Sequence, residues 1–163
     1  MTETIESVRI TKIKRVENVY ARVYLSAQQS NLTGDAWVKI NLNTIFKDLG
    51  LNFDTATFKF VVPVTGLYNI IGAVEFSSTV ADKRYLTAIY KNGTSIREVA
   101  GQASFISTLT VECNEEVFLL EGDEIELYVQ SEAGSGIDTV DVVSGSKATM
   151  MIIRLVTKEG TRQ

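Results

Sequence analysis

The 163-residue sequence predicts an all-β domain of the sandwich or barrel type, on three observations. Apolar residues alternate with polar ones in several segments, which is typical of strands that bury one face. The pair Asn92-Gly93 stands between two such segments and predicts a tight hairpin, because that turn needs a left-handed backbone. Further turn signals recur at the spacing of a sandwich or barrel, at Gly66, Gly122-Asp123, Gly134 to Gly136 and Ser144-Gly145.

Two strands in succession are expected near the middle of the chain. Residues 56–62 place Phe58, Phe60 and Val62 on one face, and the following strand does the same with Tyr68, Ile70, Val74 and Phe76. Later segments with a period of two are 82–91, 104–113, 124–130 and 148–156. The one helical candidate, residues 43–49, is short, and we expect a turn within a loop there.

Composition indicates a single domain with a sizeable core. With 45 % hydrophobic residues, the chain can bury roughly 70 % of its unfolded surface. Its formal net charge of -4 repels phosphate, so nucleic acid is not an expected partner. No apolar run approaches the roughly 20 residues of a membrane helix, and the first residues lack the apolar core of a secretory signal. We therefore expect no membrane insertion.

The residue types exclude most catalytic chemistry. The chain has no histidine, so neither a Ser-His-Asp nor a Cys-His site nor a common zinc hydrolase site can be built. The single cysteine, Cys113, rules out an internal disulfide, and we expect a buried small apolar residue rather than a reactive thiol. We predict no catalytic residue and no cofactor, although two of the 20 acidic residues could still form a glycosidase pair.

Three landmarks follow one another along the chain. The first is a set of mostly apolar positions whose spacing contains no insertion or deletion relative to the family resembled below. They are Leu42, Asp48, Phe53, Phe60, Gly66, Tyr68 and Ile70. The second is the pattern L-x-x-G-D-x-I-x-L, which contains Gly122 and Asp123, and the third is a closing strand that starts near Ser144. From about Ala21 to Val156, they resemble the complement 1q globular head family, a branch of the tumour necrosis factor-like jelly rolls. Leu42 and Ile70 depart from the family's aromatic choice, and Gly72 stands where the family prefers a bulky residue.

The resemblance implies a two-sheet antiparallel jelly-roll sandwich of about ten strands that assembles as a compact homotrimer. The expected organisation is an N-terminal arm over residues 1–20, a head over 21–157 and a tail over 158–163. The arm could attach the trimer to a larger particle, swap onto a neighbouring subunit, or add an edge strand to its own sandwich.

Two strands carry more apolar surface than one sandwich can bury. If Tyr68 points into the sandwich, the opposite face of its strand carries Leu67, Ile71 and Ala73. The closing strand has Met151, Ile153 and Leu155 on one side and Met150 and Ile152 on the other. We expect one of these faces to lie on the threefold axis of the trimer. The alternative is that a longer loop covers it within a monomer.

Other single residues have two interpretations each. Asp138 and Asp141, in the loop before the last strand, could hold calcium as some family members do, or could merely solvate the loop. Trp37 could stack on a sugar ring, although we expect a core or interface anchor. Asn31 and Asn92 stand in glycosylation motifs that we attribute to chance.

These features predict a non-enzymatic, trimeric structural or adhesion module. Within that class we expect a bacteriophage virion component, namely a capsid decoration protein, head fibre or tail appendage, made in the cytoplasm and located on a virion or extracellular surface. Its partners would be copies of itself, the particle, and a surface glycan or receptor. The alternatives are a carbohydrate-binding or hydrolytic jelly roll, and a secreted cytokine-like ligand that lacks its leader.

Overall fold

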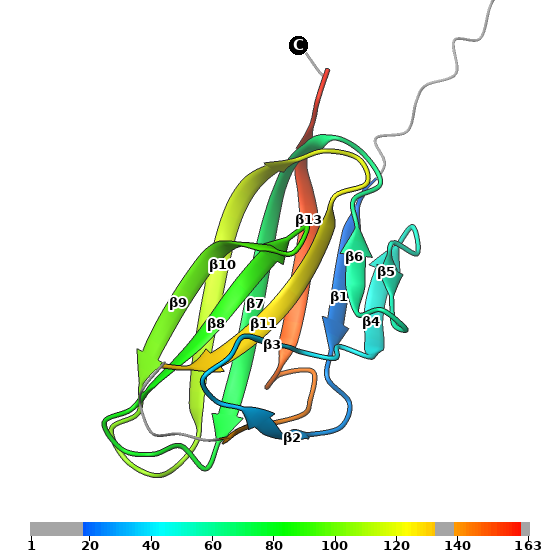
Figure 1. Cartoon of the computed structure of the whole chain (residues 1–163). Helices are drawn as coiled ribbons and strands as arrows, with labels where there is room; N and C mark the ends of the chain where they lie inside the picture. Colours follow the sequence, from blue (N-terminus) through cyan, green and yellow to red (C-terminus); the bar gives the residue numbers. More distant parts are fainter. Residues whose placement is uncertain (1–17, 133–138, 161–163) are drawn as a thin grey trace, which may run out of the picture.

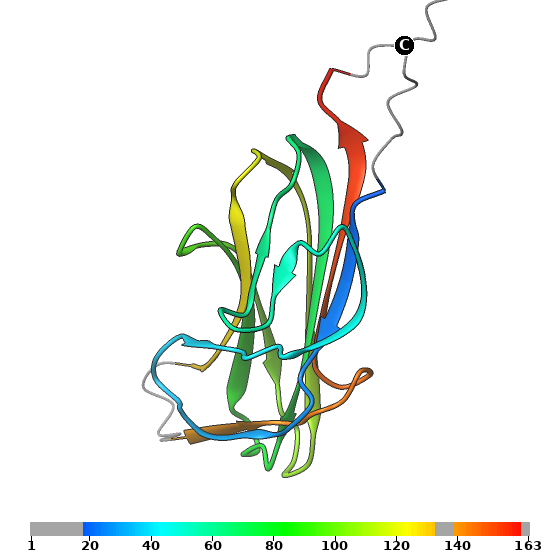
Figure 2. The same cartoon turned by 90° about the vertical axis from the view of Figure 1, so that its right-hand side faces the viewer.

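The computed structural model describes residues 18–132 and 139–160. It confirms the predicted fold class, because the described residues form thirteen strands and no helix. The strands make two antiparallel sheets that pack face to face (Figures 1 and 2). The described chain begins and ends at the same end of the sandwich (Figure 1).

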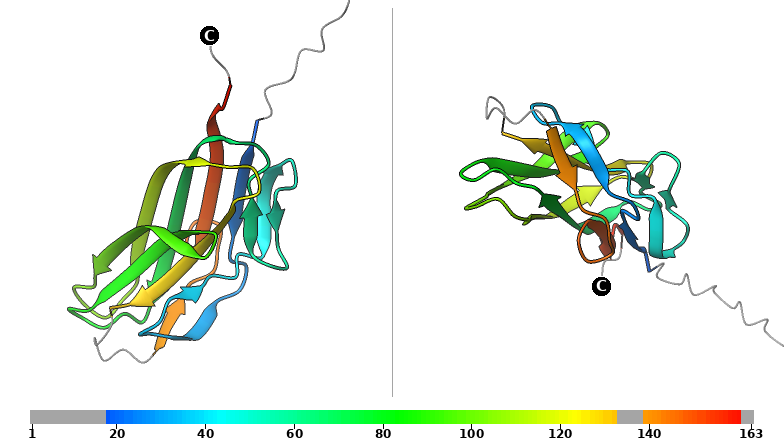
Figure 3. Two further views of the ribbon diagram at one scale, coloured as in Figure 1. Left: turned by 45° about the horizontal axis from the view of Figure 1, so that its top comes forward. Right: turned by 90° about the horizontal axis from the view of Figure 1, so that it is seen from below.

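The first sheet has seven strands in the order β2-β12-β7-β13-β1-β4, with β10 paired to the other side of β7. Their bounds are β1 Tyr20–Tyr24, β2 Gln29–Thr33, β4 Thr44–Leu49, β7 Gly66–Ser77, β10 Leu109–Leu119, β12 Thr139–Val142 and β13 Met150–Lys158. The long strands β7, β10 and β13 lie side by side, and β2 and β12 pair at one end (Figure 3).

The second sheet has six strands in the order β5-β6-β11-β8-β9, with β3 also paired to β11. Their bounds are β3 Val38–Lys39, β5 Phe53–Asp54, β6 Lys59–Val61, β8 Arg84–Lys91, β9 Thr94–Gln102 and β11 Glu124–Ser131. The Asn92-Gly93 hairpin between β8 and β9 is confirmed, and both residues have positive φ, 50° and 79°.

The landmark residues of the sequence support this sandwich in different ways. Leu42, Phe53, Phe60, Tyr68 and Ile70 are all buried in the core between the sheets. The polar landmarks Asp48 and Asp123 instead accept hydrogen bonds from backbone amides that begin or end strands: Asp48 Oδ2 from Phe53 N at 2.8 Å, and Asp123 Oδ2 from Leu120 N at 2.8 Å.

The glycine landmarks mark two close approaches and one turn. A Cβ on Gly66 would lie 2.4 Å from the carbonyl oxygen of Thr157, so only glycine lets β13 pass there. Gly122 has a φ of +89° in the turn before β11. At Gly72 a Cβ would lie 2.4 Å from Leu127 Cδ1, so the Leu127 side chain occupies the space that a bulky residue would need at that position.

Three local expectations from the sequence are wrong. Residues 44–49 form strand β4 rather than a turn, because β4 pairs with β1 along its length. Residues 104–108 belong to a loop, and β10 starts only at Leu109. The buried hydroxyl of Thr79 holds that loop, since it lies within hydrogen-bonding distance of the carbonyl oxygens of Phe105 and Ser107, at 3.3 and 3.2 Å. Phe58, expected beside Phe60, has a φ of 58° and lies in the turn before β6.

Candidate subunit interface

The outer face of the seven-stranded sheet is built in rows that follow from strand register. Five of its strands stand in the order β10, β7, β13, β1 and β4. Side chains of residues that oppose each other across strands share a face and lie about 5 Å apart. Three successive outward rows are Glu112-Ala73-Met150-Tyr24-Thr44, Asn114-Ile71-Ile152-Arg22-Lys47 and Glu116-Asn69-Arg154-Tyr20-Leu49. We call this surface the outer face.

The centre of the outer face is apolar. Ile71, Met150 and Ile152 are half-buried there, and Ala73 beside them is only 4 % exposed. The aromatic ring of Tyr24 follows in the same row as Met150. Aliphatic side chains thus continue across β7 and β13 without an interleaved charge, which is unusual for a sheet face that meets only water.

Charges divide across the outer face by sign. The β10 side carries Glu112 and Glu116, whereas the opposite side carries Arg22, Lys47 and Arg154. Arg22 is fixed within its own subunit. Its Nη2 donates to the carbonyl of Ser146 at 2.8 Å, and its guanidinium lies 4.8 Å from the centroid of the exposed Phe46 ring.

The predicted interface residues fall on two different sides. Leu67, Ile71 and Ala73 lie on the outer face, as expected from the opposite orientation of Tyr68. Met151 and Ile153 are each 1 % exposed and point into the sandwich, because they oppose Gly72 and Ile70 across β13 and β7. Leu155 packs against the same core. The outward side of β13 is therefore carried by Met150 and Ile152 instead.

Only one of the two calcium candidates lies among the described residues. Asp138 lies outside them, and Asp141 accepts a hydrogen bond from the Asn31 amide, 2.7 Å from its Oδ1. Within residues 18–132 and 139–160, no three His, Cys, Asp or Glu side chains form a group that could hold a metal ion.

Cys113 is buried in the core, whereas Trp37 is partly exposed on the surface. Cys113 is fully buried, and burial raises the pKa of its thiol to about 12. Trp37 is half-buried outside the core, where it meets the Tyr90 ring edge to face at 5.9 Å. Tyr90 in turn stacks on Tyr128 at 4.1 Å. Trp37 is thus not a core residue, and its ring packs on the outer side of the six-stranded sheet, where an interface anchor stays a prediction.

Two acidic groups have pKa values shifted away from what a glycosidase acid needs. Hydrogen bonds from the Thr57 hydroxyl at 2.7 Å and the Ala56 amide at 2.8 Å lower the pKa of Asp54. Burial raises the pKa of Asp123, but hydrogen bonds from Lys91, Leu120 and Asn92 outweigh it and lower the pKa below 3.8. Both carboxylates are held ionised in structural turns.

No helix in the described part of the chain is long and apolar enough to cross a membrane. No protein-family model and no curated protein matches the sequence.

Solved structures match the fold over nearly the whole chain. Eiger TNF from S. frugiperda has a TM-score of 0.68 at 11 % identity, covering 90 % of this chain and 98 % of its own. The globular domain of zebrafish complement 1qA has a TM-score of 0.64 at 16 % identity, covering 88 % and 100 %. Murine APRIL has a TM-score of 0.62 at 11 % identity, covering 85 % and 99 %.

These likenesses confirm the predicted fold. The chain is a jelly roll of the tumour necrosis factor and complement 1q type. At these low identities the likeness is one of fold.

Proposed function

We propose that this protein is a non-enzymatic structural or adhesion module that works as a homotrimer, and that the outer face is its subunit interface. The observation that carries the proposal is the apolar centre formed by Ile71, Ala73, Met150 and Ile152. Burying such side chains against another copy contributes roughly 1 kcal/mol or more for each half-exposed aliphatic residue.

The outer face suits a second copy of this chain better than a water-facing role. Its aliphatic residues lie on the two central strands, β7 and β13, and each of these strands pairs with a neighbour on both of its edges. A partner can therefore pack on these side chains to form a hydrophobic interface that resembles the core of a domain. The trimer implied by the family resemblance uses three such contacts.

Two observations support the non-enzymatic part of the proposal. Histidine is missing from the whole chain, and the carboxylates of Asp54 and Asp123 have lowered pKa values. Three equivalent subunits would give such a module avidity for a repetitive surface.

A virion component remains our narrower proposal within this class. The described chain begins and ends at one end of the sandwich, so an attached particle and an exposed adhesive end would lie at opposite ends (Figure 1). Electron microscopy of particles with the full chain and with a chain lacking residues 1–17, which leaves β1 and the core residue Val19 in place, tests this role. Unchanged attachment of the shorter chain would refute the arm as the attachment segment.

A substitution at the centre of the outer face tests the interface. Ile152→Glu places a carboxylate among apolar side chains, and we expect it to yield a folded monomer where the unmodified chain is a trimer. Leu86→Glu is the matched control, because Leu86 is a half-buried aliphatic residue on the outward side of β8 in the other sheet. Ile152→Glu variants that keep the mass of the unmodified chain would refute the interface.

A further inference from the structure

Charges of opposite sign, without ion-pair partners among residues 18–132 and 139–160, occupy the two sides of the outer face. We propose that Glu112 and Glu116 on β10 of one subunit bind Lys47 and Arg154 of the next subunit, and so set the orientation in which the subunits join. This inference rests on the proposed trimer and names the contacts that direct it.

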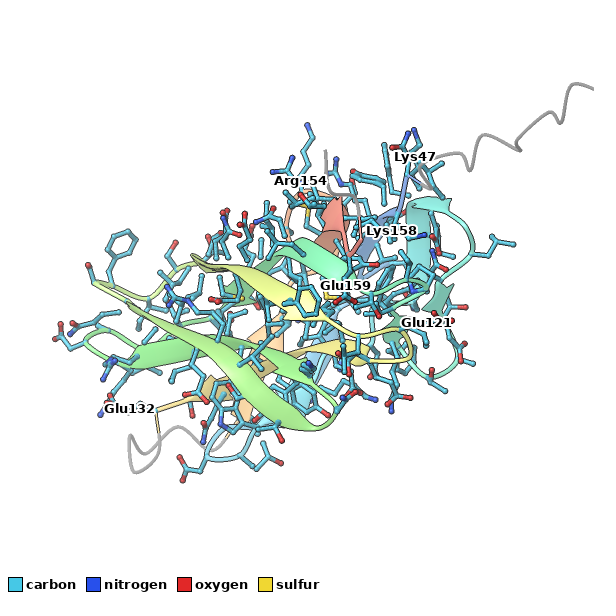
Figure 4. The ribbon with its side chains drawn as sticks, turned by 90° about the horizontal axis from the view of Figure 1, so that it is seen from above. Lys47, Glu121, Glu132, Arg154, Lys158 and Glu159 are labelled. Atoms are coloured by element: carbon cyan, nitrogen blue, oxygen red, sulfur yellow. The ribbon has the colours of Figure 1, made fainter. Side chains whose placement is uncertain are left out.

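The basic side of the outer face contains a depression into which acidic side chains of a neighbouring subunit could fit. Lys47 and Arg154 line a surface depression of about 390 Å³ between β1, β4 and β13, together with Tyr20 and Leu49. Figure 4 shows Lys47 and Arg154 on the same side of the sandwich. Both side chains are exposed, and neither forms an ion pair with any residue in 18–132 or 139–160. Among the described residues, the depression therefore presents two cations without an acidic partner, beside the apolar side chain of Leu49.

The acidic side belongs to an edge strand. Within the seven-stranded sheet β10 pairs only with β7, and β9 of the other sheet packs beside it without backbone pairing, with Arg97 Nε 3.9 Å from Glu115 Oε2. Glu112 and Glu116 are exposed on the outward side, about 13 Å apart along the strand. Asn114 between them is already engaged, since its Oδ1 accepts a hydrogen bond from Asn69 at 2.7 Å. Among the described residues, neither glutamate has a cationic partner.

Several charged side chains of the six-stranded sheet, in contrast, form ion pairs within the subunit. On the six-stranded side, Lys39 pairs with Glu126 at 2.8 Å, Lys59 with Glu124 at 2.7 Å and Arg84 with Glu132 at 2.8 Å. Those charges are neutralised within one subunit. On the outer face, by contrast, Glu112, Glu116, Lys47 and Arg154 take part in none of the ion pairs found among the described residues.

Sheet order keeps the two sides apart within one subunit. Strand β4 lies four strand spacings from β10, or about 19 Å, so Lys47 cannot reach the glutamates of its own chain. Arg154 lies in the row of Glu116, but Asn69 stands between them. Placing the acidic edge of one copy on the basic side of the next is a head-to-tail contact, which closes a ring of three copies when each contact rotates the next copy by about 120°.

Charge reversal and its compensation test the inference on the full chain. We expect Lys47→Glu/Arg154→Glu and, separately, Glu112→Lys/Glu116→Lys to raise the dissociation constant of the trimer at least tenfold at low salt, measured by sedimentation over a dilution series. The chain with all four substitutions restores the opposite charges and should return to within threefold of the unmodified value. Arg84→Glu, which breaks an ion pair within one subunit, is the matched control and should leave the constant unchanged.

Salt gives an independent measurement on the unmodified chain. Raising the ionic strength should weaken the trimer, because contacts between exposed charges are screened. Folded reversal variants with the unmodified dissociation constant, or a salt-independent trimer, would overturn the inference while leaving the proposed trimer intact. An unmodified chain that sediments at 18.0 kDa would instead overturn the proposed function itself.

Discussion

Gly72 provides a quantitative test of the packing between the two sheets. A Cβ at this position would lie 2.4 Å from Leu127 Cδ1 and 3.1 Å from Cys113 Sγ, both in the buried core. Overpacking of this kind costs about 1–3 kcal/mol, and the lower chain entropy of alanine offsets about 0.4–1 kcal/mol of that cost. We expect Gly72→Ala to lower the free energy of unfolding by about 1–2 kcal/mol.

The clash has one main partner, so a second substitution should relieve it. Leu127→Ala alone costs about 2–5 kcal/mol through the cavity it leaves. With Leu127 shortened, Gly72→Ala should cost nothing or stabilise slightly, so the two effects should depart from additivity by about 1–3 kcal/mol. The measurement is urea unfolding of all four chains at one protein concentration, because association contributes to apparent stability.

Leu119→Ala, a truncation far from Gly72, is the control for this double-mutant comparison. Leu119 is fully buried and opposes Gly66, about 20 Å from Gly72 along β7. Gly72→Ala and Leu119→Ala should therefore add to within about 0.5 kcal/mol. If the effects of Gly72→Ala and Leu127→Ala on the unfolding free energy also add to within about 0.5 kcal/mol, the close contact between Gly72 and Leu127 is refuted.

Two further predictions concern titratable groups. Because the pKa of Asp123 is lowered on folding, its contribution to stability is present above pH 3.8 and is lost as the pH falls through the lower folded value. Asp123→Asn should therefore lower the unfolding free energy by about 1–3 kcal/mol at pH 6 and by less at pH 3, and a pH-independent difference would contradict this. Burial and a pKa of about 12 should keep Cys113 from reacting with iodoacetamide at pH 8 until the chain is unfolded in denaturant. Labelling of the folded chain at the rate of a free thiol would show that the core is open.

Sequence periodicity predicted the sandwich because one-sided burial repeats every two residues, as in the alternation of Tyr68, Ile70, Val74 and Phe76. Strand β4 was missed because Thr44–Leu49 shows no such alternation and is mostly exposed. It is a strand through its pairing with β1, which no local pattern reveals.

The candidate interface was predicted only in part, for a related reason. On β7 the orientation followed from Tyr68, but β13 is apolar on both sides, so alternation alone could not tell Met151 and Ile153 from Met150 and Ile152. Pairing of β13 with β7 decides it, since Met151 opposes the inward Gly72. The charged sides were not predicted, because strand order rather than sequence distance brings Lys47 and Arg154 together.

The mass of the full chain in solution tests the subunit interface most directly. Three copies of the 18.0 kDa chain make a particle of about 54 kDa, which multi-angle light scattering should report across micromolar concentrations. A particle of 18.0 kDa over the same range would contradict the account, because the apolar centre of the outer face would then meet only water.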